Sequence, residues 1–75
     1  MKEILKKNWD YTLYSSEDTL IMSVLCGSVA LYTLNIELNE LEKKKFNRSG
    51  ESFINDFAKD VRETPSIFMS RHIDI

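Results

Sequence analysis

The stretch LIMSVLCGSVALYTLNIEL, residues 20–38, decides the fold of this chain. It consists of two apolar runs joined at Gly27 and Ser28, and no charged residue occurs from Thr19 to Ile36. A glycine in the first position suits a two-residue type II′ hairpin turn, because that position needs a positive φ. The hairpin would carry apolar side chains on both faces. A chain of 75 residues can cover one face with its own helices, so the second face is expected to need a partner, a second copy or a membrane.

The predicted turn also fixes the register of the hairpin, which assigns its side chains to two faces. On one surface we expect Val24 to face Leu31 and Met22 to face Thr33, and these four residues form a candidate dimer face. The other surface is more apolar and is predicted to contribute to the core. It carries Ile21, Leu25, Leu34, Ile36 and Leu38.

The flanking segments add one strand and two helices. Residues 9–14 alternate, with Trp9, Tyr11 and Leu13 on one side, which predicts a strand. Asn39 and Glu42 have the spacing of a capping box, so a short helix is expected at about residues 40–46.

Residues 51–63 form the most regular predicted helix, because its apolar residues recur on one face and its charged residues on the other. Pro65 ends it, since the residue before a proline avoids the α region. The sequence therefore predicts a single α+β domain over residues 1–75. In it a three-stranded antiparallel β-meander (about 9–14, 19–26 and 29–37) has its helices (about 40–46 and 51–63) packed on one face.

The composition offers no catalytic or metal-binding signature. A hydrophobic content of 43% with 29% charged residues is ordinary for a globular protein. The net charge of -2 argues against a nucleic-acid-binding protein, which normally shows a basic face. One cysteine, Cys26, and one histidine, His72, supply neither a spaced metal-ligand set nor an oriented nucleophile pair. We therefore predict a cytoplasmic, non-enzymatic protein with no catalytic residue, metal or cofactor.

Membrane insertion is an alternative for the uncharged run, whose length approaches the ~20 residues that cross a bilayer as a helix. Lysines flank the run on both sides and leave its orientation undefined. The break at Gly27 and the strand-forming residues favour the hairpin. A small single-pass membrane protein is therefore only the third hypothesis for the function.

Acidic residues supply the candidate partner-binding positions. Asp56, Asp60 and Glu63 are spaced i, i+4 and i+7 on one side of the predicted 51–63 helix, and Glu17 and Asp18 occupy the turn before the hairpin. A solvated helix face carries the same pattern. As a functional surface, these residues would steer the encounter with a basic partner. The basic run at residues 43–45 is interpreted as the solvated side of a short helix.

The overall profile resembles the small, mildly acidic immunity proteins of bacterial toxin–immunity systems, such as those of contact-dependent inhibition. The resemblance rests on size, charge and a β-rich start followed by an acidic helix, and it carries over no individual residue. It implies inhibition of a cognate toxin, often a basic nuclease. The leading prediction is thus an immunity-type inhibitor that binds a cognate protein through its acidic surface. The alternative is a homodimeric structural or accessory protein that uses the second apolar face of the hairpin.

Overall fold

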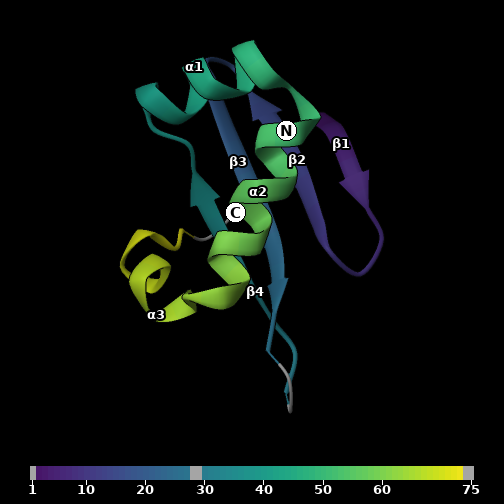
Figure 1. The fold of residues 1–75 in the computed structure, drawn as a ribbon, viewed down its shortest axis with the longest axis vertical. Coiled ribbons are helices and arrows are strands. Elements are labelled where there is room, and N and C mark those ends of the chain that lie inside the picture. Colours follow the sequence, from purple (N-terminus) through teal and green to yellow (C-terminus); the bar gives the residue numbers. More distant parts are fainter. Residues whose placement is uncertain (1, 28–29, 74–75) are drawn as a thin grey trace.

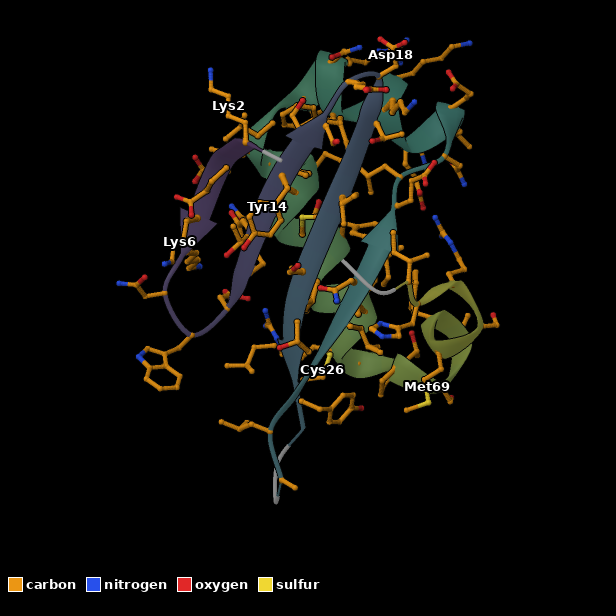
Figure 2. The ribbon with its side chains drawn as sticks, turned by 180° about the vertical axis from the view of Figure 1, so that it is seen from behind. Lys2, Lys6, Tyr14, Asp18, Cys26 and Met69 are labelled. Atoms are coloured by element: carbon orange, nitrogen blue, oxygen red, sulfur yellow. The ribbon has the colours of Figure 1, made fainter. Side chains whose placement is uncertain are left out.

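Four antiparallel strands form one sheet in the order β1-β2-β3-β4. The computed structural model describes residues 2–27 and 30–73. Its strands are β1 (Lys2–Lys7), β2 (Tyr11–Ser16), β3 (Thr19–Cys26) and β4 (Tyr32–Glu37). They are followed by α1 (Glu40–Ser49), α2 (Glu51–Glu63), α3 (Pro65–Phe68) and a 3₁₀ turn (Met69–Arg71). The helices lie on one side of the sheet and leave the opposite side, hereafter the open face, uncovered (Figures 1 and 2).

The α+β class, the antiparallel sheet and the helices on one face are as predicted, but the sheet has four strands rather than three. The additional strand, β1, is short and rich in lysine, and a bulge between Glu3 and Leu5 interrupts its pairing with β2. β2 and β4 each begin later than predicted, at Tyr11 and Tyr32. α1 extends to Ser49, beyond the predicted 40–46, whereas α2 has the predicted bounds.

The register of the β3–β4 hairpin differs from the predicted one by three residues. Val24 lies opposite Leu34 and Met22 opposite Ile36, where Leu31 and Thr33 were expected. Cys26 pairs with Tyr32, so residues 27–31 connect the strands in place of a two-residue turn. Gly27 does take the predicted positive φ, 100°, while Ser28 lies outside the described residues. Because side chains alternate along a strand, an odd shift exchanges the faces of one strand relative to the other.

The candidate dimer face is therefore wrong for β3, because Met22 and Val24 lie in the core with 0% of their surface exposed. Leu31 is 60% exposed and Thr33 is exposed too. Ile21 and Leu25, predicted for the core, alternate with Met22 and Val24 and so lie on the other side of the sheet. Ile21 is nevertheless buried, as predicted, with 6% of its surface exposed, whereas Leu25 is half-buried on the open face. Leu34, Ile36 and Leu38 do contribute to the core, as predicted. The apolar side of α2 covers these core residues through Ile54, Phe57, Ala58 and Val61.

The capping box that predicted α1 is present. The Asn39 side chain accepts a hydrogen bond from the Glu42 N–H (2.9 Å), and the Asn39 N–H donates to Glu42 Oε1 (2.9 Å). These bonds satisfy backbone donors that a helix otherwise leaves without a partner. Within the described part of the chain, no helix is long and apolar enough to cross a membrane.

The C-terminal segment covers the outer edge of β4 at Asn35 and Glu37. The Asn35 N–H donates to His72 Nδ1 (3.0 Å), and the Ile73 N–H donates to the Asn35 carbonyl (2.8 Å). Arg71 donates to the Glu37 carbonyl (3.0 Å). Main-chain groups that would otherwise be offered to another strand therefore have partners within the chain.

Candidate functional site

Trp9 has the largest exposed fraction of any large apolar side chain that the structure describes, 85%. It is the third residue of the turn that joins β1 to β2, in which the Asp10 N–H donates to the Lys7 carbonyl (3.0 Å). Its φ is +64°, in the left-handed region that a bulky side chain rarely adopts. The sequence placed Trp9 in a strand, on the same side as Tyr11 and Leu13, and that placement is wrong because the strand begins at Tyr11.

Folding gives no reason for a tryptophan at this position. The indole buries little surface, and a left-handed backbone conformation costs a residue with a Cβ on the order of 1–3 kcal/mol. Glycine or asparagine would fit the turn better. An exposed aromatic side chain on an unfavourable backbone therefore points to contact with another molecule.

The turn that carries Trp9 is fixed from both sides by its neighbour Asp10. The Asp10 carboxylate pairs with Arg62 of α2 and lies 3.5 Å from Lys7 Nζ. The Asp10 carbonyl accepts from the Leu25 N–H (2.9 Å), and Arg62 Nε donates to the Leu25 carbonyl (3.3 Å). Trp9 is thus presented from a turn that is tied to both β3 and α2.

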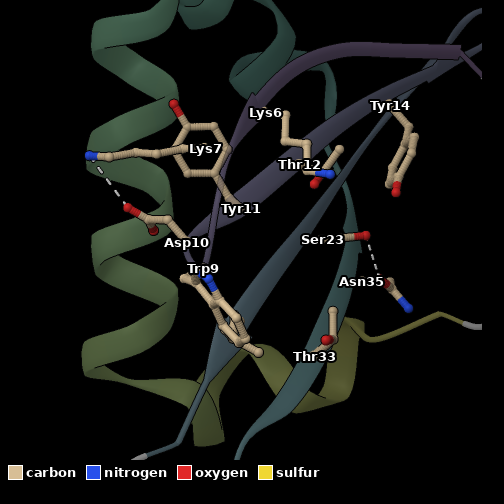
Figure 3. A pocket seen from close by; sticks show the side chains of 11 residues that line it. Lys6, Lys7, Trp9, Asp10, Tyr11, Thr12, Tyr14, Ser23, Thr33 and Asn35 are labelled. Atoms are coloured by element: carbon tan, nitrogen blue, oxygen red, sulfur yellow. Dashed lines mark hydrogen bonds and ion pairs between the residues drawn. The ribbon is translucent and has the colours of Figure 1, made fainter.

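A hollow of about 380 Å³ adjoins Trp9 and extends over the open face. In Figure 3 the Trp9 indole projects in front of the sheet, while Lys7 and Asp10 lie on the α2 side of the turn. The Ser23 hydroxyl donates to Asn35 Oδ1 (2.6 Å), which orients the Asn35 amide within the lining. The residues that line the hollow from the open face are Lys6, Thr12, Tyr14, Ser23, Leu25, Thr33 and Asn35.

This lining combines apolar contact with directed hydrogen bonding. Trp9, Tyr14 and Leu25 supply apolar surface, and the hydroxyls, the Asn35 amide and the Lys6 ammonium supply polar groups. The carboxylate of Asp10 is already engaged by Arg62 and Lys7. The hollow therefore suits a ligand with an apolar part and several hydrogen-bond acceptors.

The predicted acidic surface is divided between two places. Glu17 and Asp18 lie in the turn between β2 and β3, next to α1, where Lys43 Nζ donates to the Asp18 carbonyl (2.8 Å). Asp56, Asp60 and Glu63 lie on the exposed side of α2. Because α2 runs away from α1 along the sheet, the two groups do not form one continuous patch (Figure 1).

Cys26 and His72 have structural contacts. Cys26 is buried at the end of β3, where burial raises the pKa of its thiol, and its Sγ lies 3.6 Å from the Val24 carbonyl oxygen. His72 accepts from β4 through Nδ1. Within the described ranges, no group of three or more His, Cys, Asp and Glu side chains is arranged to hold a metal ion.

The sequence contained one signal for the Trp9 turn. Asn8 and Asp10 flank Trp9, and both are residues that favour turns. The alternation of Trp9, Tyr11 and Leu13 outweighed that signal and extended the predicted strand through the turn.

Comparison with known proteins assigns no family: no protein-family model, curated protein or solved structure matches this chain. The functional argument therefore depends on the geometry of the open face.

Proposed function

We propose that this chain is a non-enzymatic binding module for another protein, and that Trp9 and the hollow beside it form the contact surface. Trp9 carries the proposal, because its side chain is 85% exposed on a left-handed backbone. Tryptophan and tyrosine are enriched among the few residues that supply most of the binding energy at protein interfaces. An exposed tryptophan at an unfavourable backbone position is accounted for by such a role.

The fixed turn supports this proposal. Ordering a flexible loop during association reduces affinity, so a turn already held by Asp10 and Arg62 lowers the free-energy cost of binding. The polar lining of the hollow supports specificity, because Asn35 is oriented by Ser23 before any partner arrives. Together these features describe an aromatic anchor beside a hydrogen-bonding surface.

We further propose inhibition of a cognate protein, as in immunity proteins, as the biological role of this module. The exposed α2 residues Asp56, Asp60 and Glu63 support a contribution to electrostatic steering toward a basic partner. Glu17 and Asp18 lie apart from them and are left out of this surface. Reversing the three α2 charges would slow association if they steer the partner.

Trp9→Gly is expected to strengthen the fold and weaken binding. Glycine removes the strain of the left-handed conformation, roughly 1–3 kcal/mol, because it lacks a Cβ. Its more flexible backbone loses more entropy on folding, which costs about 0.5–1 kcal/mol. We therefore expect the free energy of unfolding in urea to rise by about 1 kcal/mol. Affinity for a partner isolated from the native host and then purified should fall by about 30-fold or more, as for an interface residue worth about 2 kcal/mol.

Ile67→Ala provides the matched control, because Ile67 is also a largely exposed apolar residue but lies on α3. It should leave both stability and affinity nearly unchanged. Unaltered affinity of Trp9→Gly in calorimetric titration would rule out this surface. A loss of stability in Trp9→Gly would instead show that the indole supports the fold.

A further inference from the structure

The two edge strands of the sheet, β1 and β4, differ in whether another segment of the chain contacts their outer main-chain groups. The outer edge of β4 is contacted by Arg71, His72 and Ile73. β1 is the terminal strand on the other side, and no segment among the described residues pairs with its outer edge. Residues 2–27 and 30–73 thus cover one edge at Asn35 and Glu37 and leave the main chain of the other edge available to an incoming strand.

The open edge is basic although the protein as a whole is acidic. β1 carries Lys2, Lys6 and Lys7 against one acidic residue, Glu3, and all four are exposed. The net charge of the entire chain is -2. A strand that pairs with β1 would therefore meet local positive charge.

This charge disfavours a second copy of the chain as the pairing strand. Joining β1 to β1 would bring lysine-rich strands together, and like charges on paired strands destabilise a sheet. Lysines on an edge strand are a known means of preventing self-association. A strand of opposite charge meets no such repulsion.

The edge leads directly into the proposed contact surface. β1 ends at Lys7, two residues before Trp9, and both Lys6 and Lys7 line the hollow. Figure 3 shows Lys6 on the same side of the sheet as Thr12 and Tyr14. A strand added along β1 would direct alternate side chains toward this hollow.

We infer that the partner, whose surface opposite α2 is basic, presents a separate extended acidic segment that pairs with the free edge of β1 and places an apolar side chain against Trp9. The inference rests on the proposed function and specifies the chemistry of the partner. Main-chain hydrogen bonds along β1 would supply affinity, as in other cases of strand addition. Carboxylates near Lys6 and the apolar contact with Trp9 would supply selectivity.

Trp9 is the single tryptophan of the chain, so its fluorescence reports directly on this site. The probes are synthetic peptides of about eight residues, a typical strand length, that alternate valine with glutamate, glutamine or lysine. The glutamate peptide should shift and protect the Trp9 emission, and its affinity should fall as salt rises from about 50 to about 500 mM. The glutamine and lysine peptides should bind at least about tenfold more weakly.

Two protein variants test the role of the Lys6 charge, and one modified peptide tests the main-chain hydrogen bonds. Lys6→Glu should weaken binding of the glutamate peptide at least about tenfold, whereas Lys45→Glu, the same charge change on α1, should have little effect. N-methylation of alternate peptide amides should abolish binding when it blocks the set that faces β1, and spare it when it blocks the other set.

Equal binding of the glutamate and lysine peptides, or equal tolerance of both N-methylated sets, would overturn the inference. So would the absence of any change in Trp9 emission at peptide concentrations of about 2 mM. None of these results would decide the proposed function, because that depends on the affinity of Trp9→Gly for the intact partner. The two ideas can therefore fail separately.

Discussion

Val24→Glu is expected to unfold the protein. Val24 is 0% exposed and lies in the core that α2 covers. A carboxylate there would be buried without a partner, at a cost of several kcal/mol. A chain of 75 residues has a free energy of unfolding of about 4–11 kcal/mol, so this cost approaches the whole stability. Far-ultraviolet circular dichroism and urea unfolding at pH 7 would measure the loss.

Thr33→Glu is the matched control, because Thr33 belongs to the same predicted dimer face but is exposed on β4. It should change stability by about 0.5 kcal/mol or less, as is usual for exposed positions. A folded Val24→Glu variant that differs from the native protein only in its oligomeric state would contradict the core assignment and restore the dimer face.

The helices were predictable because their signals are local. The apolar stripe of α2 and the capping box at Asn39 each depend on residues within a few positions of one another. The register of the hairpin depends on pairing between strands, and a glycine at residue 27 does not fix the loop length. A three-residue shift was enough to exchange the faces of β3 and place Val24 in the core.

The correct register does have a sequence signature. It pairs Ser23 with Asn35, two polar residues that share a hydrogen bond across the open face. It also pairs Val24 with Leu34 in the core. Matching polar positions across the two strands, rather than starting from the turn, would have separated the faces correctly.

The candidate site was less predictable than the fold. β1 is six residues long and half of it is lysine, so it lacks the β-branched and alternating pattern of a buried strand. Because the sequence did not predict β1, it did not predict a hairpin turn at residues 7–10 either. Trp9 was therefore assigned to the following strand. The exposure of Trp9 follows from that turn and from the contacts of Asp10 with α2, which lies some fifty residues away in sequence.

Glu42→Gln is expected to destabilise the protein by about 2 kcal/mol at neutral pH and much less in acid. Arg71 Nη2 donates to Glu42 Oε1 (2.7 Å) and Nη1 to Oε2 (3.0 Å), which joins the start of α1 to the C-terminal segment. Breaking a fully buried ion pair costs about 3–5 kcal/mol. The cost is smaller here because the Arg71 side chain is 33% exposed, so solvent screens the pair. Glutamine keeps an acceptor for the Asn39 N–H but loses the charge that holds Arg71.

The pH dependence follows from the pKa of Glu42. Burial alone would raise this pKa, but the hydrogen bonds from Arg71 and the Asn39 N–H, with the charges of Arg71 and Lys45, lower it overall. A carboxyl whose pKa is lower in the folded state stabilises the fold above its unfolded pKa, about 4.3. That stabilisation disappears as the pH falls through the folded pKa. Urea unfolding at pH 7 and at about pH 3 should therefore show the two proteins converging.

Glu40→Gln is the control for this experiment. Glu40 also lies in the first turn of α1 and pairs with Lys43 at 3.3 Å, but its side chain is 85% exposed. Its loss should have little effect on stability at either pH, because exposed ion pairs contribute little. If Glu42→Gln lowers the free energy of unfolding by the same amount at pH 7 and pH 3, the charge of the Glu42 carboxylate does not hold the C-terminal segment. Convergence would assign that role to the Glu42–Arg71 pair, since only an ionised carboxylate attracts Arg71.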